Sequence, residues 1–554
     1  KAGISVTVVA GDRPGDGSLV RYPKEEEWEG IRIRRFAAAP FDRNRISGWV
    51  ANSLLFYPNA LWSLLRLPPH DLMVFLSDPP LVFALGPILR QLKGTPYACW
   101  SQDVYPEAAV RLGILRSGGL LTPVLSALSR LGLRGAGLVI AIGEGMAGLI
   151  EDKGVSSERI AVVHNWADGE QISPVNPRDN SFLKPLCLEE NFNVLYSGNM
   201  GLGNDFETLI PAVENLKMDP LIRFIFIGDG KRRGELFNRM GNLPNVRFFP
   251  FQKESGLSQS LSGGTVHLVT LRKELSGVLV PSKIYGAMAA GRPIIFIGPE
   301  ESEAARIIRD EKIGFVMEPG DSEGLVEVLR RLSKSPEQTD EMGRRARALF
   351  ESRFDRKIAT QSIRSVLVRA LEGPLPESMA KRLFDMVLSG FGLIGSLPLW
   401  IVFSILIKRE DGGPVFYPQA RTGKGGRRFN ALKFRSMVPD AEEKTGPVQA
   451  EYNDSRVTRI GKFLRATAMD ELPQLLNIFK GDMSFVGPRA LRPREAERKI
   501  QDGGDRRSGK GESRFHLRHR IRPGLTGLAQ IYAPRDATRR QKLRYDMLYL
   551  RRRS

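Results

Sequence analysis

Cysteine is nearly absent from this chain of 554 residues, which contains only Cys99 and Cys187. Two cysteines so far apart in the sequence provide neither a disulfide framework nor a cysteine-rich metal site, and they fit a reducing cytoplasm. Histidine is also scarce: the five residues are scattered, apart from His516 and His519 in an arginine-rich stretch. The sequence therefore gives little support for a zinc-type site.

Acidic residues are outnumbered, because 62 Asp and Glu face 82 Lys and Arg, for a net charge of +20. This excess implies an acidic partner such as nucleic acid, anionic lipid or a phosphorylated substrate. The chain has no zinc-finger, RNP or basic-zipper pattern, so we expect no nucleic-acid partner, although a basic nucleic-acid-binding protein stays open as an alternative. The basic residues cluster beside an apolar segment, which favours anionic lipids of a membrane surface.

The apolar segment spans residues 383–407 and is long enough, by the criterion of about 20 residues, to cross a bilayer. Basic pairs flank it, Lys381-Arg382 before and Lys408-Arg409 after, and the positive-inside rule disfavours placing either pair on the far side. Pro398 lies within it and bends a helix. We predict a re-entrant helix broken at Pro398, with both ends at the cytoplasmic face of the inner membrane. A single-pass anchor is the alternative.

Two adjacent carboxylates, Asp470 and Glu471, lie among residues typical of phosphate sites. An aspartate can attack phosphorus and form an acyl phosphate when a divalent cation and basic side chains offset the charge repulsion. Glu471 is placed to share the metal or to orient Asp470. The candidate counter-charges for a diphosphate are Lys433, Arg435, Arg465 and Arg489. Alternatively, an Asp-Glu pair before a proline is simply a solvated helix start.

From about Lys381 to its end, the chain resembles the monotopic phosphoglycosyl transferases of the bacterial sugar transferase family. The resemblance is carried by ordered motifs, which include Gly413-Pro414-Val415-Phe416, Lys433-Phe434-Arg435-Ser436-Met437, Asp470-Glu471-Leu472-Pro473-Gln474, Gly481-Asp482-Met483-Ser484 and Arg522-Pro523-Gly524-Leu525-Thr526-Gly527. It implies transfer of a phosphosugar from a UDP-sugar to undecaprenyl phosphate through a covalent intermediate on Asp470. It also implies Mg²⁺ held by Asp470 and Glu471, UMP as the first product, and Arg522 among the phosphate-binding residues.

This chain departs from that family at two places. The sequence Pro488-Arg489-Ala490 stands where the family usually has Pro-Arg-Pro, and Leu397-Pro398 stands where it usually has Ser-Pro. The first difference bears on the shape of the nucleotide pocket. The second leaves the helix break to Pro398.

Up to about residue 355, short β-branched runs alternate with helical patterns. The runs are 6–9, 72–76, 138–142, 194–196, 224–227, 266–269 and 294–297. This alternation predicts parallel sheets with helices on both faces, hence an α/β fold. Glycine turns follow two of the runs and open helices, as a phosphate site requires. Their residues, with the basic and hydroxyl side chains nearby, are the nucleotide-sugar candidates Gly198, Asn199, Gly228, Gly230, Lys231, Ser282 and Lys283.

Residues 1–370 resemble family 4 retaining glycosyltransferases with two Rossmann-like domains, the glycosyltransferase B fold. The run from Val280 to Ile294, Gln102-Asp103-Val104-Tyr105-Pro106 and Glu144-Gly145-Met146 carry the resemblance. It implies a UDP-sugar donor on the second domain, no cofactor, and an acceptor near Asp103 and Glu144. Many relatives have two glutamates with seven residues between them where this chain has Val278 and Gly286, so we do not expect their carboxylate contact to the ribose here, and Glu274 is a displaced candidate substitute.

These observations divide the chain into four parts. We expect residues 1–165 to form the acceptor-side Rossmann-like half, residues 166–370 the nucleotide-sugar half, residues 371–379 a proline-containing linker, and residues 380–554 a mostly helical α+β monotopic membrane domain. Relatives extend beyond both ends, so we expect either that this chain is a fragment of a longer natural one or that these parts are missing from it.

Together they predict a bifunctional enzyme of bacterial glycoconjugate biosynthesis. One unit makes a lipid-linked sugar and the other adds a second sugar to it. In the alternative, only one unit is active and the other is an anchor or regulator. The identity of either sugar, the linkage, the lipid length and the oligomeric state, a homodimer included, are left open.

Overall fold

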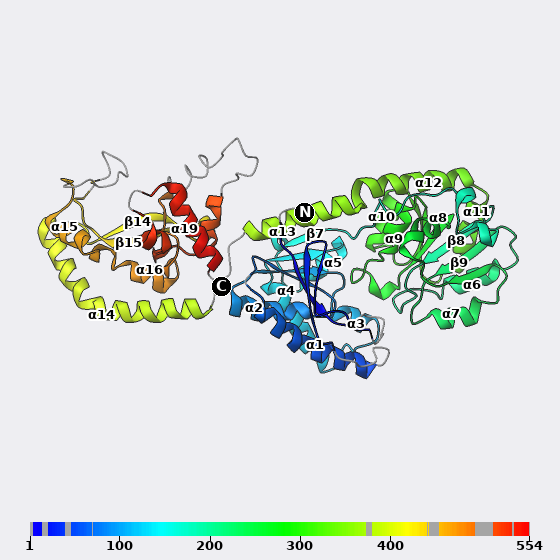
Figure 1. The fold of residues 1–554 in the computed structure, drawn as a ribbon, viewed down its shortest axis with the longest axis horizontal. Coiled ribbons are helices and arrows are strands. Elements are labelled where there is room, and N and C mark those ends of the chain that lie inside the picture. The colour runs from blue at the N-terminus through cyan, green and yellow to red at the C-terminus, as the bar shows by residue number, and fades with distance from the viewer. Residues whose placement is uncertain are drawn as a thin grey trace.

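The computed structural model describes residues 4–13, 20–38, 46–68, 70–372, 379–439, 441, 454–493, 514–534 and 537–552. Most of the predicted linker, residues 373–378, lies outside this set, as do the last two residues and parts of the C-terminal basic clusters. Figure 1 shows two α/β units followed by a smaller unit that begins with a long helix.

The first half of the α/β region contains a parallel sheet in the order β4 (Met73–Leu76), β5 (Tyr97–Ser101), β6 (Leu138–Ala141) and β7 (Ile160–Val162). Its helices are α1 (Ile46–Arg66), α2 (Gly86–Lys93), α3 (Glu107–Arg111), α4 (Leu121–Gly135) and α5 (Glu144–Asp152). A second sheet pairs β3 (Ile31–Phe36) with β1 (Thr7–Gly11) and β2 (Glu25–Trp28). The core of this half forms between the β4–β7 sheet and its helices.

The second half contains six parallel strands. Their order is β10 (Val246–Phe249), β9 (Ile222–Ile227), β8 (Phe192–Ser197), β11 (Val266–Thr270), β12 (Ile294–Ile297) and β13 (Gly314–Met317). The strand order reverses between β8 and β11, and ligands of doubly wound sheets bind where the strands end at such a point. The helices are α6 (Leu209–Asn215), α7 (Arg233–Met240), α8 (Leu257–Ser262), α9 (Lys283–Ala289), α10 (Glu303–Asp310), α11 (Ser322–Ser333) and α12 (Pro336–Leu349).

All seven runs predicted to be strands overlap strands of these sheets. The pattern missed β2, β3, β5, β7, β10 and β13. Strand β2 is Glu-Glu-Glu-Trp, and in β5 Ala98, Cys99 and Trp100 replace the expected β-branched residues. Strand β5 lies between two recognised runs, because it pairs with β4 and β6, whereas β2 pairs with β3, which was itself missed. Pairing with neighbouring strands therefore overrides weak local propensity here.

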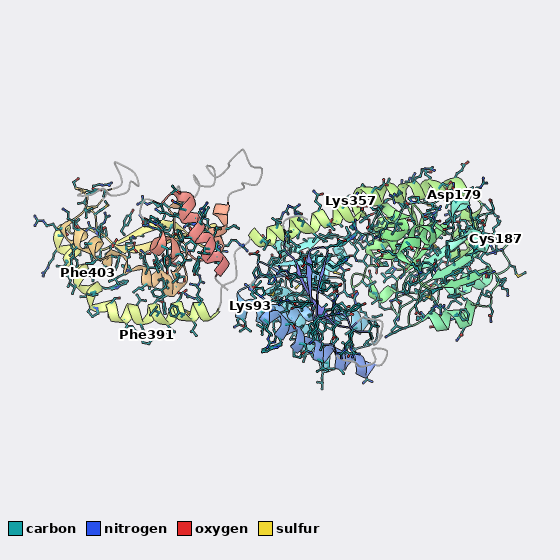
Figure 2. All side chains as sticks on the ribbon, viewed as in Figure 1. Lys93, Asp179, Cys187, Lys357, Phe391 and Phe403 are labelled. Atoms are coloured by element: carbon teal, nitrogen blue, oxygen red, sulfur yellow. The ribbon has the colours of Figure 1, made fainter. Side chains whose placement is uncertain are left out.

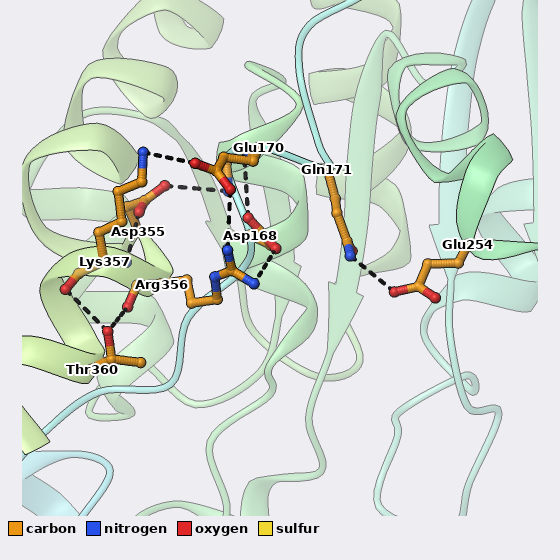
Figure 3. Close-up of polar contacts among 9 residues, drawn as sticks. Asp168, Glu170, Gln171, Glu254, Asp355, Arg356, Lys357 and Thr360 are labelled. Atoms are coloured by element: carbon orange, nitrogen blue, oxygen red, sulfur yellow. Dashed lines mark hydrogen bonds and ion pairs between the residues drawn. The ribbon is translucent and has the colours of Figure 1, made fainter. Parts of the chain in front are cut away.

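Helix α13 (Arg356–Glu372) follows the second half in sequence but packs on the first. Its Ile363, Val366 and Leu367 contact Ala98, Leu138 and Ile140 of β5 and β6. Where the chain passes from the second half back to the first, the Asp355 carboxylate accepts a hydrogen bond from the Gly169 amide at 3.2 Å. Beside it, Arg356 forms ion pairs with Asp168 at 2.9 Å and Glu170 at 3.1 Å (Figure 3). The chain thus crosses between the halves twice at one place.

The C-terminal unit begins with α14 (Met379–Asp411). The antiparallel hairpin of β14 (Phe416–Thr422) and β15 (Arg428–Phe434) follows, then α15 (Arg459–Ala466) and α16 (Gln474–Lys480). The parallel pair of β16 (Ser484–Val486) and β17 (Gly524–Thr526) leads into α18 (Leu528–Tyr532) and α19 (Arg539–Arg552). Two small cores join α14 to the hairpin and to α16.

Helix α14 is apolar and mostly exposed: within the described residues it alone is long and apolar enough to cross a membrane, and 17% of its most apolar window is buried. The helix is continuous through Pro398 but bent (Figure 1). Phe391 and Phe403 lie on the two limbs of the bent helix (Figure 2). Pro398 lies between them in the sequence, and a proline inside a helix bends it. The observed helix extends the predicted 383–407 at both ends.

Candidate active sites

Asp470 and Glu471 lie in a single turn of 3₁₀ helix between α15 and α16. Ala468, just before the turn, has a φ of 56°, which L-residues adopt rarely. The chain can therefore leave α15 sharply, and Pro473 then starts α16. Because of this reversal, both carboxylates lie against β15, the strand that carries Lys433.

Lys433 joins the two carboxylates. Its Nζ atom is 2.5 Å from Oε1 of Glu471 and 3.9 Å from Oδ2 of Asp470. The Asp470 side chain is only 13% exposed, whereas that of Glu471 is 36% exposed. Burial raises the pKa of Asp470 above its usual value and Glu471 adds to the rise, while Lys433 and Arg465 oppose it. The site thus holds a poorly solvated carboxylate next to two cations.

Arg465 and Arg435, both predicted to bind phosphate, have different surroundings. Arg465 lies near Asp470, and its Nε donates to Oγ of Ser436 at 2.8 Å. Arg435 is buried, 6% exposed, and its guanidinium pairs with Asp411 and donates to the Pro414 carbonyl at 2.6 Å and the Met437 carbonyl at 2.9 Å. Arg435 therefore joins the end of α14 to β15, a structural role that the sequence did not predict.

Arg489 and Arg522 lie at the β16–β17 pair. The Arg489 side chain is exposed and its backbone bridges to Gly524. Gly481, at the end of α16, has a φ of 99°, and a Cβ there would lie 3.3 Å from Nη2 of Arg522 and 3.2 Å from Nη2 of Arg382. Arg382 donates to the carbonyls of Ile478 and Phe479, both at 2.7 Å, and so satisfies the end of α16. From the sequence, Arg382 was predicted only to flank the membrane segment.

The carboxylates of Asp470 and Glu471 fit the magnesium that the family resemblance implies. Mg²⁺ commonly takes one or two carboxylates and fills its remaining positions with water and substrate phosphate oxygens. The described residues contain no group of three or more His, Cys, Asp or Glu that could hold a metal. An ion held by these two carboxylates would therefore take its other ligands from water and from a bound diphosphate.

In the second half, the two glycine turns predicted to bind phosphate pack against each other. A Cβ on Gly228 would lie 2.1 Å from the carbonyl oxygen of Gly198, and a Cβ on Gly230 would lie 2.4 Å from Oδ1 of Asn199. All three glycines have φ between 132° and 144°, so other residues would strain the backbone. The turns follow β8 and β9, at the edge where the strand order reverses.

Lys283, at the start of α9, reaches the same place. Its Nζ is 3.4 Å from Oδ1 of Asn204 and 5.0 Å from the centre of the Tyr196 ring, and a Cβ on Gly198 would lie 2.8 Å from its Cε. Burial lowers the pKa of Lys283 to about 8. Ser282 and Lys231 are exposed beside these turns. The structure thus brings Lys283, Gly198 and Gly228 together.

On the acceptor side, Asp103 lies just after β5, where the amides of Gln102 and Asp103 donate to Oγ of Ser77 at 2.9 Å and 3.3 Å. Burial, followed by the charge of Asp78, raises the pKa of Asp103 to about 6. Glu144 has an exposed carboxylate at the start of α5. The proximity of Asp78 to Asp103 was not predicted, because Asp78 follows a different strand and is distant in sequence.

The two halves meet beside Glu144. Its amide donates to Oε2 of Glu303 at 3.2 Å, and Arg111 donates to the carbonyls of Glu274 at 3.2 Å and Ser276 at 2.7 Å. Val278 is fully buried in the core, and the Glu274 carboxylate pairs with Arg272 at 3.4 Å. Glu303, 12% exposed, lies at this boundary, but no motif in the sequence pointed to it.

Comparisons with known proteins divide the chain in the same order. Residues 376–554 match the family model described as bacterial sugar transferase, residues 1–166 the glycosyl transferase 4-like domain, and residues 191–335 glycosyl transferases group 1. The exopolysaccharide production protein ExoY of Rhizobium meliloti (strain 1021) is 39% identical over 186 residues, which are 31% of this chain and 77% of ExoY. The chain therefore belongs to the bacterial sugar transferase family, fused to a glycosyltransferase as predicted.

A longer match is the UDP-glucose:undecaprenyl-phosphate glucose-1-phosphate transferase of Xanthomonas campestris pv. campestris, 32% identical over 255 residues. The match covers 44% of this chain and about half, 49%, of that protein. Anabaena HepE, crystallised with UDP, has a TM-score of 0.50 at 16% identity and covers 66% of this chain and 100% of HepE. That similarity confirms the glycosyltransferase B fold of the first two units.

Proposed function

We propose that this chain is a bifunctional enzyme of bacterial glycoconjugate biosynthesis. The C-terminal unit transfers a phosphosugar from a UDP-sugar to undecaprenyl phosphate and releases UMP. The N-terminal unit then adds a second sugar from a nucleotide sugar to the lipid-linked product. The observation that carries this proposal is the mostly buried Asp470 carboxylate held beside Glu471, Lys433 and Arg465.

The first step is a displacement at phosphorus. An oxygen of the ionised Asp470 carboxylate bonds to the β-phosphorus of the UDP-sugar, and the bond from that phosphorus to the bridging oxygen breaks, so UMP leaves with the bridging oxygen and its electron pair. A phosphate oxygen of undecaprenyl phosphate then attacks the same phosphorus and displaces the Asp470 carboxylate. The product is an undecaprenyl diphosphosugar, and the free aspartate is restored.

The neighbouring residues make this displacement feasible. Lys433 and Arg465 offset the repulsion between the carboxylate and the diphosphate. Glu471 holds the Lys433 ammonium at 2.5 Å and so fixes its position beside Asp470. When bound by Asp470 and Glu471, Mg²⁺ supplies further neutralisation of the diphosphate charge.

The membrane arrangement we propose is the re-entrant one. Near one end of α14, Arg382 binds carbonyls of α16, and near the other, Glu410 accepts the amides of Arg459 at 2.6 Å and Ile460 at 3.2 Å in α15. A straight helix of that length would separate these residues by about 40 Å. Attachment of both ends to one unit, with the bend between them, supports a cytoplasmic-face monotopic anchor over a single crossing.

In the N-terminal unit, the turns at Gly198 and Gly228 and the Lys283 ammonium would bind the diphosphate of the donor, without a metal. Asp103 and Glu144 lie on the half that receives the acceptor. HepE was crystallised with UDP, which supports a uridine nucleotide as the donor carrier in this unit.

The test is to trap the covalent intermediate. Purified full-length protein receives a UDP-sugar and Mg²⁺ without undecaprenyl phosphate, is quenched, and is digested for mass spectrometry. We expect a phosphosugar adduct on the peptide containing Asp470 and release of one UMP per enzyme. Asp470→Asn should give neither, whereas Asp310→Asn, at an exposed position of α10, should give both. An adduct on another residue, or one that survives Asp470→Asn, would refute the assignment.

Two variants, each with one of the two sites disabled, distinguish the bifunctional enzyme from the alternative with a single active unit. Asp470→Asn should abolish UMP release but retain sugar transfer to a pre-made lipid-linked sugar, and Lys283→Met should do the reverse. If either variant abolishes both reactions while the protein stays folded, the two sites do not act independently.

A further inference from the structure

Three neighbouring helices of the first half expose apolar side chains. Along α4, Leu121, Val124, Leu128 and Leu131 recur at spacings of three and four residues and are all exposed, as is Leu120 just before the helix. This spacing places them on one face of α4. The buried residues Ser129, Gly132 and Leu133 lie on an adjoining face of the helix. The exposed face is therefore additional to the one that forms the core.

Helices α2 and α1 continue this apolar surface. Ile88 and Leu92 are exposed on α2, which packs between α4 and α1, and Leu55 and Trp62 are exposed on α1. Figure 1 shows the three helices next to one another. Isolated exposed leucines are ordinary, but nine large apolar side chains on adjacent helices indicate an interaction surface. We refer to the exposed sides of α1, α2 and α4 as the apolar face.

The charged side chains on the three helices of the apolar face all have one sign. Residues 44–70, 79–102 and 108–143, which contain the three helices, include no Asp or Glu. Arg66, Arg116 and Arg130 are exposed there, and the Arg66 guanidinium lies 4.3 Å from the centre of the Trp62 ring. Apolar side chains with Trp and Arg at their margin, and without acidic residues, match the interface of a bilayer that contains anionic lipids.

We propose that the apolar face docks the first half directly on the anionic membrane surface, as a second membrane contact separate from α14. The charge favours a lipid surface over a second copy of this chain, because a second copy would bring basic surfaces together. Docking would hold the acceptor-side half at the bilayer, where a lipid-linked acceptor is confined. The two catalytic units would then share one membrane surface through independent contacts.

The test measures where the apolar face lies in the full-length protein, reconstituted in nanodiscs of phosphatidylethanolamine and phosphatidylglycerol. A nitroxide is attached at Leu128→Cys in a Cys187→Ser background. The reference is the same label on the native Cys187, which is exposed in the second half, while Cys99 is buried. Collision with oxygen, which concentrates in lipid, is compared with collision with a nickel chelate, which stays in water.

We expect the label at position 128 to collide more often with oxygen than with the nickel chelate. The label at Cys187 should collide more often with the nickel chelate than with oxygen. The double variant Val124→Glu, Leu131→Glu should move the label at 128 into water. Both positions are exposed, so the fold should be retained, and far-UV circular dichroism checks this. The readout requires no turnover, so it is independent of the proposed activity.

Three results would overturn the proposal. Equal nickel accessibility at 128 and 187 would place the apolar face in water. Inaccessibility to both reagents would mean that another part of this chain covers it. Dipolar broadening between labels at 128 would identify a second copy as the occupant.

Discussion

Nζ of Lys433 lies 2.5 Å from Oε1 of Glu471, and Asp470 is more distant from the same ammonium at 3.9 Å. The lysine is thus held by the carboxylate that we do not assign as the nucleophile. Asp470 receives the electrostatic effect of the cation without forming its short ion pair, so its oxygens stay available for attack. This division of roles leads to the first prediction.

Lys433→Met should move the acid limb of the pH–rate profile to higher pH. Lys433 lowers the pKa of Asp470 against the effect of burial, so its removal raises that pKa further. The ionised carboxylate is the nucleophile, so kcat/KM falls on the acid side and recovers in part at alkaline pH. The measurement is UMP release across pH, with Lys480→Met at an exposed position of α16 as the control. An equal loss at every pH would indicate only a phosphate contact.

Asp470→Asn should lower UMP release by about 10³-fold or more without destabilising the protein. The folded state raises the pKa of Asp470, so it binds more protons than the unfolded state between the ordinary and the raised pKa. The cost to stability therefore grows as pH rises through that window and persists above it. At neutral pH the amide removes this cost, so thermal unfolding should occur at an equal or higher temperature. If Asp470→Asn unfolds at a lower temperature than the unmodified protein, its loss of activity would be explained by destabilisation, and the prediction would be wrong.

Arg435→Gln should act on stability rather than on the chemical step. The variant leaves Asp411 without its partner, and we expect a loss of about 2–3 kcal/mol, at the lower edge for buried pairs because Asp411 is partly exposed. Arg435 lowers the pKa of Asp411, so the stabilisation is present above the usual aspartate pKa and is lost as pH falls through the depressed value. Arg465→Gln is the contrast: it should lower kcat with little change in thermal unfolding.

UDP binding to the N-terminal unit should weaken at alkaline pH. With a pKa of about 8 for Lys283, the protonated fraction falls about tenfold between pH 7 and pH 9, and affinity for the diphosphate should fall by a similar factor. Calorimetric titration with UDP is carried out on the unmodified protein and on Lys283→Met, and the difference between them isolates binding to this unit. Lys283→Met should bind UDP weakly at both pH values. A pH dependence that survives in Lys283→Met would assign the titration to another group.

Cutting the chain between the two catalytic units should slow the formation of the lipid-linked disaccharide. Tethering raises the effective concentration of the second site near the product of the first. A protease site placed within the predicted linker, residues 371–379, allows the same preparation to be compared before and after cleavage, with UMP release as the control that should not change. Unchanged disaccharide formation would remove any benefit of the fusion.

The sequence was sufficient where the signal is local. Asp470 and Glu471 are adjacent residues, the bend at Pro398 follows from the proline ring, and Gly198 and Gly228 occupy backbone conformations that favour glycine. Seven strands with β-branched runs were recognised, whereas β5 was missed because its pairing with β4 and β6, not its composition, makes it a strand. Short-range chemistry of this kind can be identified without coordinates.

The partners of long side chains and the packing of distant segments were decided only by the tertiary structure. Arg435 and Arg465 look alike in the sequence, yet one pairs with Asp411 inside the fold and the other lies near Asp470. Likewise α13 follows the second half in the sequence but packs on the first half. The leucines of α4 have the spacing of core residues but are exposed. The physical reason is that periodicity shows which residues share a helix face, while the burial of that face depends on which elements the whole chain brings against it.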